Sequence, residues 1–291
     1  MHGGNRVDVI MRPAAPDDAP TCGQICYAAF GSLADHHGFP RDFPSVKMAS
    51  DVLRMLIEHA GFYGVVAERD GKILGSNFMD ERSAVLGIGP ISVDPAAQDK
   101  GIGRSLMLNV LDRATARHAA GVRLVQAAYH NRSLCLYTKL GFQTREPLSV
   151  LQGPPLRLEL PGYAVRPAEP TDIDACNALC TQIHGFDRDG ELRDAIQQQS
   201  ATVVEHLGRI TGYATLVGFF GHSVAETDHD LIALIAAAPV FPGPGFLLPT
   251  RNHRVFSWCL NHGLKLSWQG TLMTMGLYNE PAGAWLPSIL Y

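Results

Sequence analysis

The sequence has no uninterrupted apolar run of 18 residues, no excess of positive charge and no Cys-x-x-Cys pair among its six cysteines. A transmembrane helix needs about 20 apolar residues, so none is expected. The formal net charge of -4 argues against nucleic acid or an anionic membrane surface as a partner. The first 13 residues lack the apolar segment of a secretory signal peptide. We therefore expect a cytoplasmic protein with reduced thiols.

The chain of 291 residues, 46% of them hydrophobic, is long enough for two globular domains. An internal repeat supports this division. The segment 12–18, RPAAPDD, returns 154 positions later as 166–172, RPAEPTD, and the same offset pairs two cysteines of each half. We predict one domain over residues 1–158 and a second over 159–291. The paired cysteines, Cys22 with Cys26 and Cys176 with Cys180, are four residues apart on predicted helices, where core packing is expected rather than metal binding.

Hydrophobic periodicity predicts an α/β (α+β) chain in which helices and strands alternate. In the first half we expect strands at 7–11, 63–68, 72–79, 85–93 and 122–129, and helices at 18–31, 45–60, 105–120 and 131–141. A polar, aromatic loop is expected over residues 32–45. In the second half we expect helices at 172–184, 190–199, 228–238 and 252–262, and strands at 201–207, 210–218, 222–226 and 245–249.

The most informative stretch is residues 84–105, AVLGIGPISVDPAAQDKGIGRS, which predicts a strand, a glycine-containing loop and a helix. The first turn of a helix carries free N–H groups and the positive end of the helix dipole. Glycines let that backbone approach a ligand closely. The arrangement predicts a phosphate or pyrophosphate site, although a surface turn that caps a helix is the alternative. The Gly-x4-Gly-Lys-Ser/Thr and Gly-x-Gly-x-x-Gly patterns are both absent.

The loop resembles the coenzyme A pyrophosphate loop of the GNAT acetyltransferase superfamily, Gln/Arg-x-x-Gly-x-Gly/Ala. Gln98, Gly101 and Gly103 match its three fixed positions. The resemblance implies two GNAT-like domains, each with a mixed, mostly antiparallel central sheet flanked by helices. It also implies acetyl-CoA as co-substrate, bound by a loop and by the backbone of the preceding strand. The implied contacts are Ile91, Ser92, Val93, Gln98, Asp99, Lys100, Gly101, Ile102, Gly103, Arg104 and Ser105.

The preceding strand carries Gly87, Gly89 and Pro90, which favour a β-bulge, although plain irregularity is the alternative. A backbone N–H near residues 91–93 would then face the thioester carbonyl and stabilise the developing oxyanion.

A second set of implied site residues follows the strand at 122–129. The resemblance gives Asn131 a hydrogen bond to the cofactor, with a helix N-cap as the alternative. Tyr137 lies where the family often has the acid that protonates the departing thiolate, with plain packing as the alternative. Ser133, four residues earlier, would share its helix face. Asp80, Glu81 and His130 are candidates for the base, and none of them is assigned. For Asp80 and Glu81 the alternative, which we expect, is an exposed carboxylate in a turn.

The second half has Ala225-Glu226-Thr227-Asp228 where the first has the glycine loop, and its two carboxylates would repel a pyrophosphate. We expect a degenerate GNAT-like domain without a pyrophosphate loop. The apolar tail, residues 281–291, is expected to fold back into a groove between the domains or to cross to another subunit.

The resemblance implies an N-acetyltransferase in which a primary amine of a small molecule or peptide attacks acetyl-CoA directly. Residues 32–44 would contribute to amine recognition. No metal is expected, and His36 and His37 are not interpreted as ligands. The alternative is a non-catalytic acyl-CoA sensor or scaffold. Expected partners are acetyl-CoA and the amine, with no nucleic acid and no membrane; a homodimer is left open.

Overall fold

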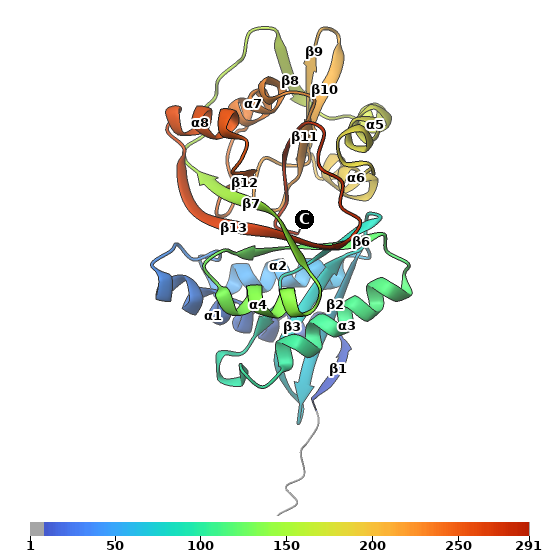
Figure 1. The fold of residues 1–291 in the computed structure, drawn as a ribbon, viewed down its shortest axis with the longest axis vertical. Helices are drawn as coiled ribbons and strands as arrows, with labels where there is room; N and C mark the ends of the chain where they lie inside the picture. The colour runs from blue at the N-terminus through green and yellow to red at the C-terminus, as the bar shows by residue number, and fades with distance from the viewer. Residues whose placement is uncertain (1–8, 291) are drawn as a thin grey trace, which may run out of the picture. The chain divides into compact units, whose positions relative to one another are not determined.

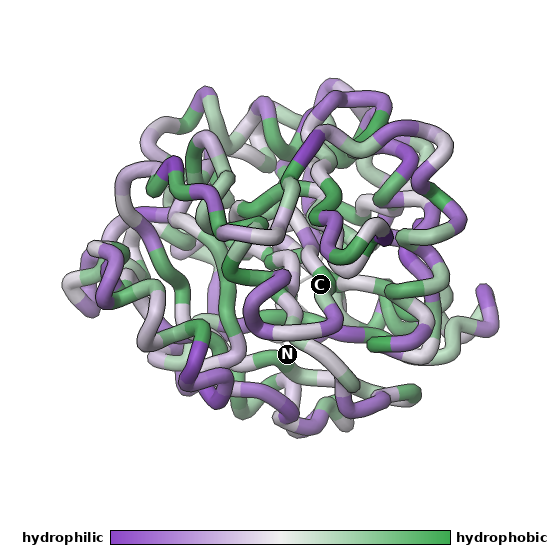
Figure 2. Tube along the Cα trace, turned by 90° about the horizontal axis from the view of Figure 1, so that it is seen from above, coloured by the Kyte–Doolittle hydropathy of each residue, from purple (hydrophilic) through white to green (hydrophobic). Residues whose placement is uncertain are grey.

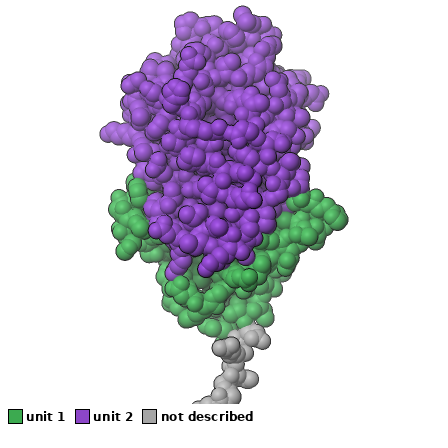
Figure 3. All heavy atoms as spheres, in the orientation of Figure 1, with its two compact units in different colours: residues 1–81, 87–119 green, residues 82–86, 120–291 purple. Residues whose placement is uncertain are grey.

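A computed structural model describes residues 9–290, which divide into two compact units (Figure 3). One unit consists of the chain up to Glu81 together with Gly87–Ala119, and the other of Arg82–Leu86 and the chain from Ala120. Each unit is described by itself below. The predicted boundary between residues 158 and 159 divides the chain into two repeated halves. The compact units are defined by contacts and do not test that boundary, which stays a prediction.

The first unit is an antiparallel sheet with helices on both faces (Figure 1). Strand β3 pairs with β2, β4 and β5, and β2 pairs with β1. Successive side chains of a strand point to opposite faces. Accordingly, Ser76 faces the Cys22 thiol of α1, whereas Asn77 reaches the backbone of α3. Its elements are β1 (Ile10–Pro13), η1 (Pro16–Asp18), α1 (Ala19–His37), α2 (Val46–Glu58), β2 (Phe62–Arg69), β3 (Lys72–Asp80), β4 (Val85–Ile88, across the division), β5 (Ser92–Val93), η2 (Pro95–Ala97) and α3 (Ile102–Ala116).

Three predictions for this unit need correction. Helix α1 extends to His37, not to residue 31, and ends at Gly38, whose φ of 70° makes it a left-handed C-cap. The predicted loop therefore shrinks to residues 38–45. The strand predicted at 85–93 is two short strands, β4 and β5, and Gly89, whose φ is 141°, lies between them. Of the strand predicted at 7–11, residues 7 and 8 lie outside the described residues.

The second unit contains two antiparallel sheet segments, ordered β6-β13-β7-β12 and β14-β11-β10-β9-β8. The helices and strands predicted for the second half are present within a few residues. Strands β7, β8, β13 and β14 were not predicted. The elements are β6 (Gly121–Ala127), α4 (Asn131–Lys139), β7 (Gln143–Gln152), β8 (Tyr163–Pro167), η3 (Pro170–Asp172), α5 (Ile173–His184), α6 (Asp189–Gln197), β9 (Thr202–His206), β10 (Arg209–Ala214), β11 (Ser223–Ala225), α7 (Asp228–Ala237), β12 (Phe246–Pro249), α8 (His253–Asn261), β13 (Lys265–Gly276) and β14 (Ala284–Leu286).

The arginine of the repeated segment makes the same contacts in both halves. Arg12 donates to the Asp18 carboxylate over 2.7 and 2.9 Å. Arg166 donates to Asp172 over 2.7 and 3.0 Å. Each arginine also donates its Nε to a glutamate of the next hairpin, Glu68 in the first half and Glu205 in the second. The same arginine contacts occur in both halves, with the same spacing and with partners of the same type. They support the interpretation of the chain as an internal duplication.

The interior follows the hydrophobic pattern, and Figure 2 shows the hydrophobic residues interspersed along the trace. The four paired cysteines of α1 and α5 are fully buried, as core packing requires. The apolar tail also has a partner surface: β14 pairs with β11, and Trp285 is 3% exposed. The tail therefore lies as a strand within the second sheet, which the prediction of a groove or another subunit did not anticipate. No helix within residues 9–290 is long and apolar enough to cross a membrane.

Candidate functional site

Strand β5 leads into the glycine loop and leaves one of its edges without a ladder partner. Within the described chain β5 pairs only with β3. The Asp94 N–H points towards β3, because it donates to the carbonyl of Leu74 in β3 over 2.9 Å. Successive N–H groups of a strand point in opposite directions, so the Val93 N–H faces the open edge. Of the predicted backbone donors, Val93 is thus aimed away from the sheet and Ser92 towards it.

The loop itself is held by its own short-range hydrogen bonds. The Asp94 carboxylate accepts from the Ala96 N–H over 2.9 Å, and the Gln98 side chain donates to the Val93 carbonyl over 3.2 Å. Lys100 Nζ donates to the Ala96 carbonyl over 3.2 Å. Gln98, the first fixed residue of the motif, therefore braces the loop against the end of β5.

Helix α3 begins at this loop with no side chain capping its first turn. Its N-cap, Gly101, has a φ of 84°, which favours glycine, and makes no side-chain cap bond. The Ser105 N–H is bonded to the Gly101 carbonyl at 3.0 Å. The N–H groups of Ile102, Gly103 and Arg104 precede that bond and have no acceptor within the helix. Three backbone donors and the helix dipole are consequently available to an anion.

In the corresponding helix of the second half, α7, side chains of the helix N-terminus cap the first turn. Thr227 is its N-cap and accepts from the Asp230 N–H at 3.3 Å, while the Asp230 carboxylate accepts from the Thr227 N–H at 3.1 Å. Glu226 is ion-paired with Arg209. Only two residues lie between Ala225, the last residue of β11, and the start of α7, so no long loop intervenes. The geometry favours the predicted loss of the pyrophosphate loop, which stays a prediction.

The predicted residues of α4 belong to the second unit, so the predicted set is divided between two units. Asn131 is exposed and is the first residue of α4, whose N-cap is His130. The N-cap alternative for Asn131 is therefore wrong. Ser133 Oγ donates to the His130 carbonyl over 2.9 Å and to Gln126 over 3.1 Å. Tyr137 is 7% exposed, and burial raises the pKa of its phenol. The phenol thus keeps its proton at neutral pH and gives it up less readily than an exposed tyrosine.

The two carboxylates considered for the base are not exposed turn residues, contrary to expectation. Asp80 is 7% exposed. Both oxygens of Glu81 accept from Arg113, over 2.5 and 2.9 Å, and Arg117 lies 3.5 Å away. Glu81 is therefore a structural ion-pair partner rather than a free base.

Sequence reasoning missed another carboxylate, Asp42, in the loop between α1 and α2. Burial raises its pKa from 3.8 to about 6. No hydrogen bond or ion pair reaches its side chain from residues 9–290. In the sequence, only its neighbours give a signal: Arg41 and Phe43 have large side chains that can pack against the helices and fix the loop on either side of Asp42.

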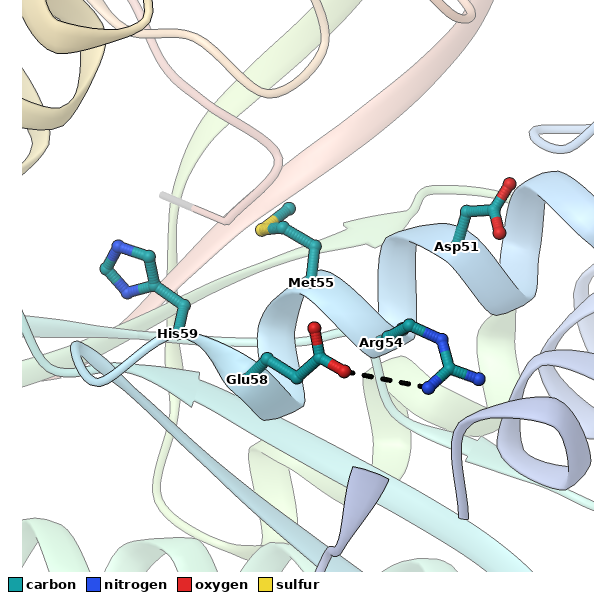
Figure 4. A pocket seen from close by; sticks show the side chains of 5 residues that line it. All are labelled: Asp51, Arg54, Met55, Glu58 and His59. Atoms are coloured by element: carbon teal, nitrogen blue, oxygen red, sulfur yellow. Dashed lines mark ion pairs between the residues drawn. The ribbon is translucent and has the colours of Figure 1, made fainter. Parts of the chain in front are cut away.

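A shallow, open hollow lies over one face of α2 (Figure 4). Its lining is Asp51, Arg54, Met55, Glu58 and His59, none of them a predicted site residue. Arg54 and Glu58 are 3.6 Å apart and partly neutralise each other. The hollow lacks a converging set of polar groups, so it is not the candidate site. Nor do residues 9–290 hold three or more His, Cys, Asp or Glu side chains placed for a metal ion.

Comparisons with known proteins relate the chain to acetyltransferases. Residues 59–144 match the family model "Acetyltransferase (GNAT) domain". A proposed acetyltransferase from Pyrococcus horikoshii is similar over all of this chain and 96% of its own, with 16% identity and a TM-score of 0.73. A GCN5-related N-acetyltransferase from Sphaerobacter thermophilus is similar over 94% of this chain and 96% of its own, with 17% identity and a TM-score of 0.60.

A tandem GNAT protein from the clavulanic acid biosynthesis pathway covers 92% of this chain and 98% of its own, at 15% identity and a TM-score of 0.55. No curated protein matches the sequence significantly. The family match lies across the glycine loop, and the structural likenesses extend over both halves. The predicted fold class, an α/β chain with mostly antiparallel sheets flanked by helices, is confirmed.

Proposed function

We propose, from the premise that the chain is a tandem-domain protein of the GNAT superfamily, that it transfers an acetyl group from acetyl-CoA to a primary amine of a small molecule or peptide. The observation that carries the proposal is the uncapped start of α3, directly after the open edge of β5. The two features supply donors for a pyrophosphate and for a thioester carbonyl in one continuous segment. That segment lies inside the region matched by the GNAT model.

Each chemical task then has a named group in the chain. The N–H groups of Ile102, Gly103 and Arg104 bind the pyrophosphate. The Val93 N–H donates to the thioester oxygen as negative charge develops there during attack by the amine. Tyr137 is the proposed acid for the departing thiolate, and Asn131 and Ser133 the proposed further contacts to the co-substrate. No metal is required for direct attack.

Titration of acetyl-CoA into the purified protein by calorimetry tests the proposal. One site per chain is expected. Gly103→Asp should abolish binding without disrupting the helix, because a carboxylate in a first turn suits the dipole but blocks and repels a pyrophosphate. The matched control is His253→Asp, which adds the same group to the exposed first turn of α8. Equal affinity in both variants would refute the assignment.

The non-catalytic sensor is the second candidate, and the raised pKa of Tyr137 is the observation that favours it. A sensor has no need of a proton donor, whereas an enzyme that uses Tyr137 does. Tyr137→Phe should leave acetyl-CoA affinity unchanged in both cases. Slower release of the CoA thiol in the presence of an amine supports the enzyme. Absence of amine-dependent thiol release from the wild type supports the sensor.

A further inference from the structure

We propose that Gln126 is a further binding residue for the acyl donor, and that its side-chain carboxamide donates a hydrogen bond to an amide carbonyl in the pantetheine arm of acetyl-CoA. The inference rests on the acetyltransferase function proposed above and deepens it. It assigns a role to a side chain that sequence reasoning did not single out. The argument uses only residues of the second unit.

Gln126 is buried near the end of β6, and its amide nitrogen has no partner within the described chain. The side chain is 5% exposed. None of residues 9–290 accepts a hydrogen bond from Nε2, and this atom is itself out of contact with the protein surface. A buried N–H group without an acceptor is costly, so this group is expected to meet an acceptor that is not part of the chain.

The amide of Gln126 is held in one orientation by Ser133 of α4. The Ser133 hydroxyl donates to Gln126 Oε1 over 3.1 Å and to the His130 carbonyl over 2.9 Å. Because Oε1 is engaged by the helix, Nε2 is the atom left to meet a ligand. An amide nitrogen only donates hydrogen bonds, so the group that it recognises must be an acceptor.

Helix α4 also carries the groups proposed above for the acyl donor. Ser133 and Tyr137 are four residues apart on α4 and therefore lie on one face. The bond from Ser133 to Gln126 shows that this face packs on β6, in agreement with the 7% exposure of Tyr137. Gln126 is therefore in direct contact with the helix face that carries the proposed acid and a proposed co-substrate contact.

The side chains around Gln126 favour a neutral ligand group. Leu124 precedes it on the same face of β6, and the residues directly opposite on β13 are Met273 and Thr271. Neither these three side chains nor Ser133 carries a charge, so a phosphate group would find no counter-charge among them. An amide carbonyl matches a neutral N–H donor. The pantetheine arm supplies such carbonyls, and it is the part of acetyl-CoA that leads to the thioester.

A second glutamine of the same unit has a structural role and serves as the matched control. Gln152, the last residue of β7, donates Nε2 to the carbonyls of Phe241 and Gly243 over 3.1 and 2.8 Å. Its Oε1 accepts from the Gly153 N–H over 2.8 Å. Gln152 therefore satisfies both ends of its amide within the chain, whereas Gln126 satisfies one end.

The test compares Gln126→Met with Gln152→Met, because methionine has a similar length and no amide. Acetyl-CoA and 3′-phospho-ADP, the nucleotide part of CoA without the pantetheine arm, are titrated into the purified proteins by calorimetry. Gln126→Met should weaken acetyl-CoA binding about 5- to 10-fold, as expected for the loss of one hydrogen bond, and leave binding of the nucleotide unchanged. Gln152→Met should bind both ligands as the wild type does.

Urea unfolding separates a binding role from a structural one. Gln126→Met should keep about the wild-type midpoint, because loss of the bond to Ser133 is offset by removal of an N–H group without a partner. Gln152→Met should lower the midpoint, because it removes hydrogen bonds at both ends of the amide.

Unchanged acetyl-CoA affinity in Gln126→Met, at any midpoint, would overturn the proposal, because the amide would then meet only solvent or protein. Equal weakening of both ligands would overturn it as well, because the effect would not come from the pantetheine arm. Absence of acetyl-CoA binding by the wild type would instead refute the proposed function on which the assignment rests.

Discussion

The stability of the second unit should decline in mild acid because two histidines are buried as a neutral pair. His184 and His222 are both 0% exposed, and their Nε2 atoms are 3.1 Å apart. Burial lowers the pKa of each ring well below 6.5, and the nearby positive charges of Arg123 and Arg188 lower it further. In the unfolded chain the same rings take up protons near pH 6.5. Below that pH the unfolded state therefore binds protons that the folded state does not.

The sign and size of the effect follow from proton linkage. The free energy of unfolding falls as pH decreases wherever the unfolded state binds more protons. If both rings stay neutral in the fold, lowering the pH from 8 to 5 costs about 2 kcal/mol per ring, or about 4 kcal/mol for the pair. Asp42 acts in the opposite direction, because its pKa is raised to about 6 and the folded state takes up its proton first. That gain, about 1 kcal/mol at pH 5, is common to all histidine variants and cancels between them.

The assay is urea unfolding at pH 8 and pH 5 for the wild type, the double variant His184→Gln/His222→Gln and the control His262→Gln. His262 is exposed and lies against Trp258. At pH 8 the double variant should be less stable by about 1 kcal/mol, through loss of the hydrogen bond between the rings. Between pH 8 and 5 it should lose about 4 kcal/mol less than the wild type, while the control follows the wild type. Equal losses in all three proteins would refute the neutral buried pair.

Two further predictions concern stability. Asp18→Asn and Asp172→Asn weaken equivalent charged hydrogen bonds, to Arg12 and Arg166. Each substitution should lower the free energy of unfolding by about 1.5–3 kcal/mol, and the two effects should be similar. Their arginine hydrogen bonds lower the pKa of both carboxyls, so this stabilisation is complete above pH 4 and is lost as the pH falls further; urea unfolding at pH 7 and pH 2.5 checks the difference. Trp285→Ala should cost about 3–5 kcal/mol, because a 3% exposed indole leaves a cavity beside β11. An unchanged thermal midpoint for Trp285→Ala would mean that the tail does not pack as β14.

Much of the fold follows from local sequence patterns, and the exceptions are strands that depend on distant partners. The strands at 63–68 and 72–79 and the helices of the second half were predicted from periodicity, and the structure has them. Strands β7 and β13 were missed because neither alternates cleanly between apolar and polar residues. β7 contains Pro147, and β13 contains Gly270. Both become strands because they pair with each other, 120 or so positions apart along the chain.

The candidate site shows the same limit. The glycine loop was identified from sequence because its residues are contiguous and their chemistry is set by backbone conformation. Asp42 was missed because a carboxylate in a polar loop looks like any solvated residue. Its partial burial depends on how α1 and the loop pack, which no short motif records. The error for Glu81 was the opposite one. We expected an exposed side chain, but Arg113 of α3 and Arg117, the C-cap of that helix, form ion pairs with it.

The pairing of β13 shows a structural role for the second half, which is predicted to lack a pyrophosphate loop. β6 and β7 belong to the first half by sequence, yet within the second unit β13 lies between them and pairs with both along most of its length. The other neighbour of β7 is β12, again from the second half. A chain cut near residue 158 would leave β7 with no ladder partner. The unpaired backbone groups of such a strand carry a free-energy cost, and its exposed edges favour aggregation. The second half is therefore needed to complete the sheet of the first, whether or not it binds a ligand of its own.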